Sequence, residues 1–241
     1  MPHPNLPSPV IAIDGPAGSG KSSVGKALAA RIGFRFLDTG LMYRAATWYA
    51  LQNGIDVRDP DAVVMAVSRM EYSVGADIDN DGENLIVVNG EDVTGFLHST
   101  LVDGSVSAVS AISGVREIMV AEQRRLADGG GIVMAGRDIG TVVTTGAPLK
   151  IYLTASARTR ATRRHREIAA AASAGATARE NAGADVGIED ILRSIEQRDF
   201  VDSSRADSPL KPADDALVLD TDGLSLDEVV DRLVALAEAI T

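Results

Sequence analysis

The chain has 241 residues and a formal net charge of −11 at pH 7, and this acidic balance argues against a general nucleic-acid binder. Hydrophobic residues make up 45% of the sequence, enough for a sizeable core, and no apolar run reaches the roughly 18 residues that span a bilayer. We therefore expect neither a nucleic acid nor a membrane as partner. The sequence contains no cysteine and begins without a secretory signal, which favours a cytoplasmic location.

Strands and helices are expected to alternate along the chain. Hydrophobic patterns predict strands at 10–14, 35–37, 132–135, 149–153 and 216–219. They predict helices at 22–32, 41–51, 60–70, 115–126, 156–172, 189–200 and 225–240, the last opening on a capping box at Ser225 and Glu228. Alternation of this kind predicts an α/β fold in which a parallel β-sheet is flanked by helices.

Two segments depart from this alternation. Short strands at 71–74 and 85–88 flank ADIDNDGEN, whose Asp, Asn and Gly residues are typical of a hairpin turn. We interpret residues 71–98 as part of a small inserted lobe. The Ala/Gly-rich stretch 171–187 is predicted to be mobile.

A phosphate-binding loop connects the first strand to the first helix. Its sequence, GPAGSGKS, matches G-x-x-x-x-G-K-[ST] in the strand–loop–helix context that the motif requires. Lys21 is expected to reach the β- and γ-phosphates of a nucleoside triphosphate, and the Ser22 hydroxyl to ligate Mg²⁺. The residues expected to bind the triphosphate are Gly15, Pro16, Ala17, Gly18, Ser19, Gly20, Lys21, Ser22 and Ser23.

Residues outside the phosphate loop indicate which class of phosphate-loop protein the sequence encodes. None of the four lysines follows an asparagine, so the guanine-reading N-K-x-D segment of GTPases is absent. The apolar strand at 132–135 continues into Gly-Arg-Asp, whereas ATPase motors usually end such a strand in acidic residues. Thirteen of the nineteen arginines fall between Arg116 and Arg205, which suits a site for several phosphates. These features favour a small-molecule kinase.

Several motifs together resemble the bacterial cytidylate kinase family. They are the phosphate loop GPAGSGKS, DTGLMYR (38–44), SAVSAISGVR (107–116), GRDIGTVV (136–143) and RDFVDSSRADSPL (198–210). The resemblance extends from Val10 to Ile240. It implies a P-loop kinase that transfers a phosphoryl group from ATP, with Mg²⁺, to CMP and dCMP. We expect this kinase to be a monomer.

The resemblance implies roles for residues that bind the acceptor nucleotide. Asp138 and Arg116 would read the cytosine base, with a hydroxyl from Ser107. A carboxylate suits the N4 amino group of cytosine, and an arginine suits its N3 and O2 acceptors. Arg198 and Asp202 would bind the ribose and neighbouring groups, although their spacing also fits an i,i+4 pair within a helix. Arg205 matches a further family arginine near the phosphates.

The acceptor phosphate is expected to meet Arg44 and Arg137, because both follow strands of a sheet that binds ligands beyond its strand ends. Thr39 lies in the same loop as Arg44. Surface ion pairs are the alternative interpretation of both arginines, and a helix N-cap that of Thr39. Lys21 and Arg137 are the catalytic residues expected in the core.

Five arginines occur between Arg158 and Arg166, and such a run is usually a solvated helix face. In the family this segment is a lid over ATP, in which Arg160 and Arg164 would stabilise charge on the transferred phosphoryl group. The resemblance thus divides a single P-loop kinase domain into a core (about 9–40, 115–155 and 189–241), an acceptor-binding insert (about 41–114) and an arginine-rich lid (about 156–188).

The sequence departs from its relatives at two positions that bear on the site. Ala135 stands where relatives can carry an acidic side chain, which leaves the carboxylate contact to Mg²⁺ unassigned, and Val201 stands where some carry another arginine. Three alternatives remain open at this stage: a P-loop kinase for UMP, AMP or another metabolite, a non-catalytic nucleotide-binding module, and a nucleic-acid binder.

Overall fold

A computed structural model describes residues 9–77, 83–173, 187–205 and 207–240. The chain forms two compact units. The first comprises Met1–Thr39, Val120–Ser156 and Ser208–Thr241, and the second comprises Gly40–Met119 and Ala157–Asp207. The bounds that the sequence suggests for core, insert and lid stay a prediction.

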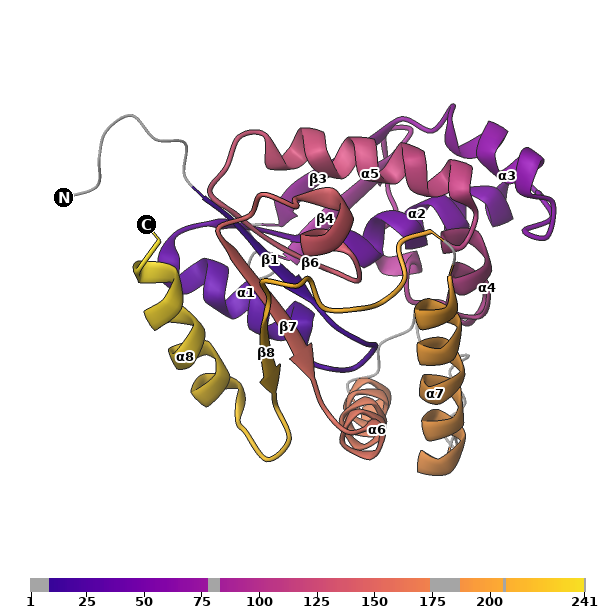
Figure 1. The fold of residues 1–241 in the computed structure, drawn as a ribbon. Helices are drawn as coiled ribbons and strands as arrows, with labels where there is room; N and C mark the ends of the chain where they lie inside the picture. Colours follow the sequence, from indigo (N-terminus) through magenta and orange to yellow (C-terminus); the bar gives the residue numbers. More distant parts are fainter. Residues whose placement is uncertain (1–8, 78–82, 174–186, 206, 241) are drawn as a thin grey trace. The chain divides into compact units, whose positions relative to one another are not determined.

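The first unit is built on a five-stranded sheet in the order β2-β6-β1-β7-β8 (Figure 1). Every neighbouring pair of strands runs parallel, so the expected parallel α/β architecture is confirmed. The central strand β1 is buried from its second residue onward, because helices cover both faces of a parallel sheet. The strands are β1 (Val10–Asp14), β2 (Arg35–Asp38), β6 (Ile132–Gly136), β7 (Leu149–Thr154) and β8 (Leu217–Asp220).

Two helices pack together with the sheet to form the main core of this unit. Helix α1 (Lys21–Ile32) contributes Val24 and Leu28, and helix α8 (Leu226–Glu238) contributes Val230 and Leu233. The capping box predicted at the start of α8 is confirmed: the Ser225 side chain accepts from the Glu228 backbone N–H, and the Glu228 carboxylate accepts from Ser225. Helix α5 (Ser113–Ala127) follows the expected span closely.

The second unit contains a three-stranded antiparallel sheet in the order β3-β4-β5. Its strands are β3 (Tyr72–Asp77), β4 (Glu83–Val88) and β5 (Glu91–Asp92), followed by the 3-10 turn η1 (Thr94–Phe96). Helix α2 (Thr39–Gln52) packs against this sheet through Ala45, next to Ile86 and Leu97. The pairing of β3 with β4 agrees with the predicted hairpin, but residues 78–82 of its turn lie outside the described residues.

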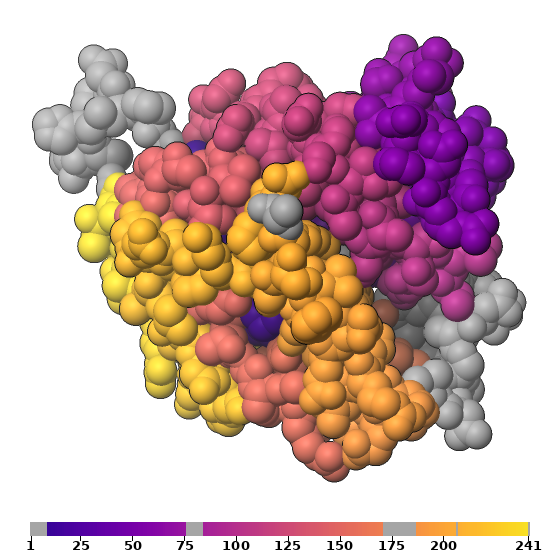
Figure 2. Space-filling model, turned by 45° about the vertical axis from the view of Figure 1, so that its right-hand side comes forward, coloured from indigo at the N-terminus to yellow at the C-terminus, as the bar shows by residue number. Residues whose placement is uncertain are grey.

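The described part of the second unit also contains the helices α3 (Pro60–Val67), α4 (Thr100–Ser110), α6 (Ala157–Ser173) and α7 (Ile188–Ser204), and the first residues of α5. Helices α6 and α7 pack on each other around Ala161, Ile191 and Ile195 (Figure 1). The outer side of α7, drawn in orange, lies at the surface (Figure 2), and Phe200 on this helix is 69% exposed. The stretch predicted to be mobile falls largely on residues 174–186, outside the described part of the chain.

No helix in the parts of the chain that the structure describes combines the length and the apolar character needed to cross a bilayer.

Candidate active site

The phosphate loop follows β1, and its glycines adopt conformations that other residues rarely take. Gly18 has φ 73° and Gly20 has φ 92°, both in the left-handed region. A Cβ at Gly15 would lie 2.1 Å from the carbonyl oxygen of Leu153 on β7, so only glycine fits there. The loop thus passes close to the ends of the central strands, where helix α1 begins at Lys21.

Lys21 is buried, and its Nζ donates to the Pro16 carbonyl at 2.7 Å within the loop. The adjacent Ser22 hydroxyl donates to Asp38 Oδ2 at 2.5 Å. Asp38 ends β2 and stands opposite Ala135 in the β2–β6 ladder. An acidic side chain thus lies opposite Ala135 on the neighbouring strand, at a residue that sequence reasoning did not assign.

These two oxygens suit Mg²⁺, which usually binds one or two carboxylates together with substrate phosphates and water. Among the described residues, no three His, Cys, Asp or Glu side chains gather as a metal site built from protein alone. The Ser22–Asp38 pair offers two oxygen ligands, so an ion held there would complete its coordination with nucleotide and water.

Arg137 and Asp138 follow β6 in the same unit. The Arg137 guanidinium donates to the Gly15 carbonyl at 3.0 Å, which joins it directly to the phosphate loop. Asp138 is 3% exposed and precedes the short π-helix η2 (Ile139–Val143). Thr39 is also buried, and its hydroxyl donates to the Ala135 carbonyl at the end of β6.

Both ends of η2 are held by charged side chains. Asp14, at the end of β1, accepts from the backbone N–H groups of Ile139 at 2.8 Å and Gly140 at 2.7 Å. Arg124 on α5 donates to the carbonyls of Val142 at 2.7 Å and Val143 at 3.2 Å. π-Helices are rare and often occur at functional sites, and this one fixes the segment that carries Arg137 and Asp138.

Burial raises the pKa of the Asp14 carboxyl from its ordinary value of 3.8 to about 6. The two backbone N–H groups and the Lys21 charge lower the pKa, whereas the neighbouring Asp138 raises it further. At neutral pH the carboxylate is ionised and accepts both hydrogen bonds.

The raised pKa of Asp14 predicts how stability depends on pH. Between pH 3.8 and about 6 the Asp14 carboxyl is protonated more often in the folded protein than in the unfolded chain. The contribution of Asp14 to the unfolding free energy is therefore largest below pH 3.8 and falls as the pH rises to about 6. We expect the unfolding free energy of the wild type, relative to Asp14→Asn, to fall by roughly 3 kcal/mol from pH 3.5 to 7.

Urea denaturation of both proteins across this pH range measures the difference. Asp220→Asn, which removes an exposed carboxylate at the end of β8, is the matched control. A difference between wild type and Asp14→Asn that rises with pH would contradict the expected direction.

The second unit gathers another group of the predicted residues around Ser110. Arg116 on α5 is 4% exposed, donates to the Ser110 carbonyl at 3.1 Å and lies over the Tyr43 ring, 5.3 Å from its centroid. Arg205 donates to the Ser110 hydroxyl at 3.0 Å and to Asp202 at 2.5 Å. Neither Ser110 nor Tyr43 was assigned from the sequence, because their contacts join segments far apart in the chain.

The remaining residues expected to bind the acceptor lie on three helices of this unit. Ser107 lies on α4, one turn before Ser110, and Arg198 lies on α7, one turn before Asp202. Asp202 accepts a hydrogen bond from Arg205 at 2.5 Å. Arg44 on α2 donates to the Leu97 carbonyl and to Asp103.

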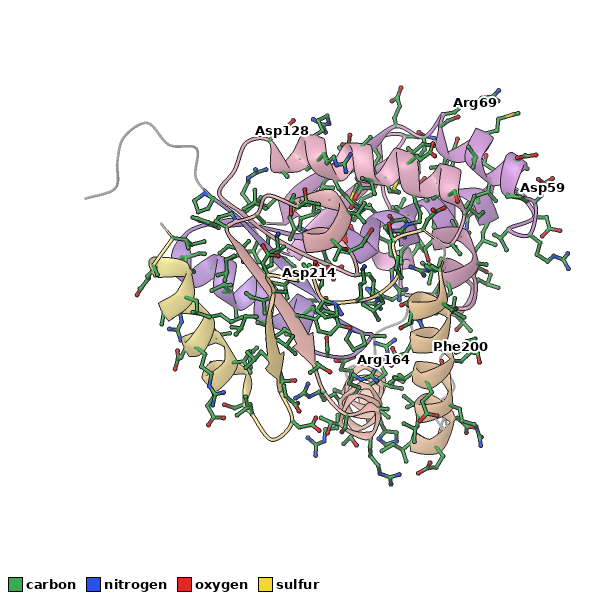
Figure 3. All side chains as sticks on the ribbon, in the orientation of Figure 1. Asp59, Arg69, Asp128, Arg164, Phe200 and Asp214 are labelled. Carbon is green, nitrogen blue, oxygen red and sulfur yellow. The ribbon has the colours of Figure 1, made fainter. Side chains whose placement is uncertain are left out.

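The two arginines of the expected lid differ in their surroundings. Arg160 is buried on α6 and pairs with Asp199 on α7 at 2.6 Å. Arg164 projects from the same helix (Figure 3), its side chain is 39% exposed, and it pairs with Glu167 at 3.2 Å and with Asp103 at 3.7 Å. Arg164 is thus the more accessible of the two in this structure.

The predicted site residues therefore fall into two groups, one in each unit. The first unit brings together Lys21, Ser22, Thr39, Arg137 and Asp138 around the strand ends of the sheet. The second unit carries Arg44, Ser107, Arg116, Arg160, Arg164, Arg198, Asp202 and Arg205.

The family model described as cytidylate kinase matches residues 11–239. The chain belongs to the cytidylate kinase family. A cytidylate kinase of Rhodococcus opacus is 47% identical over 93% of each chain. A cytidylate kinase of Streptococcus suis is 46% identical over 91% of this chain and 92% of its own, and one of Desulforamulus reducens is 42% identical over 95% and 96%.

Membership of the cytidylate kinase family makes the protein a phosphotransferase with ATP as phosphoryl donor and small-molecule nucleotides as substrates, as the sequence predicted. Solved structures give more distant likenesses: a shikimate kinase from Bacteroides thetaiotaomicron has a TM-score of 0.46 and 14% identity, covering 95% of this chain and 98% of its own. The fold assignment rests on the strand order and the phosphate loop, and not on this neighbour.

Proposed function

We propose that the protein transfers the γ-phosphoryl group of ATP to CMP, and likewise to dCMP, with ADP and the cytidine diphosphate as products. The full-length match to the cytidylate kinase family carries this proposal. The local structure supports it, because the Arg137 guanidinium donates to the Gly15 carbonyl of the phosphate loop. Asp14, which immediately precedes the loop, accepts from the backbone N–H of Ile139, the residue after Asp138.

Base selection is assigned to Asp138, Arg116 and Ser107. The Asp138 carboxylate accepts from the N4 amino group of cytosine, while Arg116 donates to N3 and O2. Uracil would present its O4 acceptor to the carboxylate, a mismatch of about 1–3 kcal/mol by analogy with base readout in nucleic acids. The remaining acceptor contacts are assigned to Arg44, Arg137 and Arg205 for phosphate and to Arg198 and Asp202 for ribose, with Thr39 beside them.

The phosphate loop from Gly15 to Ser23 binds the donor phosphates. A phosphate oxygen of CMP attacks the γ-phosphorus in line, a new P–O bond forms, and the bond from the γ-phosphorus to the β–γ bridging oxygen breaks as ADP leaves. Lys21 stabilises charge on the β- and γ-phosphates, and Arg164 stabilises the transferred group. Arg160 shares this second role only after it exchanges Asp199 for phosphate, because the two are paired in this structure.

Mg²⁺ is assigned to the Ser22 hydroxyl, with Asp38 as the carboxylate beside it, because these are hard oxygen ligands in contact. When bound, the ion neutralises charge on the donor phosphates. No general base is assigned, since the attacking phosphate oxygen is already anionic. The monomeric state, the absence of nucleic-acid and membrane partners, and the cytoplasmic location stay predictions.

The experiment is ADP release from Mg·ATP with CMP, dCMP, UMP, AMP, dTMP and shikimate as acceptors. We expect turnover with CMP and dCMP, a kcat/KM for UMP lower by about tenfold to a hundredfold, and loss of activity when EDTA removes the metal. Preference for another acceptor would retain the phosphate-loop mechanism and overturn the base assignment. A folded sample that binds ATP without acceptor-dependent ADP release would be a nucleotide-binding module instead.

A further inference from the structure

One carboxylate in the second unit lies between two of the arginines assigned to phosphate. Asp103, in the first turn of α4, accepts through Oδ1 from Arg44 Nη1 at 2.6 Å. Its other oxygen, Oδ2, lies 3.7 Å from Arg164 Nη2. Helices α2, α4 and α6 thus meet at a single side chain, although they are distant in sequence.

The contacts of Arg44 leave one side of its guanidinium available. Nη1 donates both to the Leu97 carbonyl at 2.8 Å and to Asp103, which uses both of its hydrogens. Within the described residues, no further acceptor contacts Nε or Nη2 of this arginine. Nε and Nη2 form one edge of the planar guanidinium group, and such an edge can donate to two phosphate oxygens at once.

The surroundings indicate a fixed geometry and not a chance surface pair. The Arg44 side chain is 13% exposed and that of Asp103 is 32% exposed, so water screens their interaction less than it would at an open surface. A backbone carbonyl and a carboxylate that both accept from one nitrogen fix the rotation of the whole planar group. The direction of the Nε–Nη2 edge is then set before any ligand binds.

We propose that Asp103 is a positioning residue for the acceptor phosphate, which aims the free edge of Arg44 and holds Arg164 through its second oxygen. This inference rests on the proposed function, because it takes Arg44 as a ligand of the acceptor phosphate. A carboxylate near a phosphate site weakens phosphate binding by charge repulsion. The repulsion is offset because the Arg44 side chain is already ordered, so binding of the nucleotide does not cost the entropy of ordering it.

Steady-state kinetics of Asp103→Ala and Asp103→Asn test the proposal. We expect Asp103→Ala to raise KM for CMP about tenfold, because an ordered hydrogen bond to a charged group is lost, while KM for ATP changes less than twofold. Asp103→Asn retains an oxygen that can accept from Nη1 and is expected to restore most of the affinity for CMP. In an Arg44→Ala background, Asp103→Ala should add no further increase in KM.

Asp61→Ala provides the matched control, because Asp61 is an exposed acidic residue in the first turn of α3 in the same unit. It should leave both KM values unchanged. A lower KM for CMP in Asp103→Ala would show that the carboxylate competes with phosphate, and an unchanged KM would show a merely structural contact; either result overturns the proposal. A wild type that does not turn over CMP would overturn the proposed function itself, and with it this inference.

Discussion

Replacement of Lys21 by methionine is expected to lower kcat by about 10²- to 10³-fold, the usual loss when one preorganised charge-stabilising donor is removed. Lys21 is the cation of the phosphate loop, and its Nζ lies against the Pro16 carbonyl in this structure. Charge grows on the phosphoryl oxygens during transfer, so an ammonium group there stabilises the transition state more than the bound substrates.

Methionine retains most of the buried stem of Lys21, so the variant should remain folded. The lost hydrogen bond to Pro16 is expected to cost about 1–2 kcal/mol of stability, which thermal melting measures. Lys26→Met removes a second lysine from α1 and is the matched control, with near wild-type turnover expected. Turnover of Lys21→Met within tenfold of the wild type would contradict the role given to this residue.

The parallel core could be predicted from the sequence because its information is local. β1 and β6 are almost continuous apolar runs, β7 is interrupted by Lys150, and the phosphate loop and the capping box at Ser225 are short motifs with fixed spacing. Helix α4 was not predicted, since Thr100, Gly104 and several Ser and Val residues are weak helix formers. Burial of Val102, Val106 and Val109 stabilises this helix in the folded chain.

The roles of residues in the site were harder to predict, because they depend on contacts between distant segments. Asp38 meets Ser22 only because β2 lies beside β6 in the sheet, and Arg160 meets Asp199 only because α6 packs on α7. Asp14 looks like one more strand residue in the sequence. Its function as the acceptor for η2 becomes visible once β1 and β6 are paired.

Replacement of Arg137 by alanine is expected to lower kcat/KM for CMP by about 10²- to 10³-fold, in the range of 3–4 kcal/mol for one partner of a desolvated charge pair. Arg137 is fixed from two sides: its Nη1 donates to the Gly15 carbonyl, and the segment after it is held by Asp14 and Arg124. The guanidinium is therefore preorganised, and little of its binding energy is lost to ordering.

The variant Arg137→Lys distinguishes the effect of the positive charge of Arg137 from that of its planar guanidinium geometry. Lysine keeps the positive charge but lacks the planar fork, so we expect it to recover only part of the lost kcat/KM. Titration calorimetry with ATP alone should give nearly unchanged affinity in both variants, whereas affinity for CMP should fall. Arg125→Ala, which removes an exposed arginine paired with Glu122 on α5, is the matched control. Equal losses of ATP and CMP affinity in Arg137→Ala would mean that the residue supports the phosphate loop through Gly15 and does not bind the acceptor phosphate.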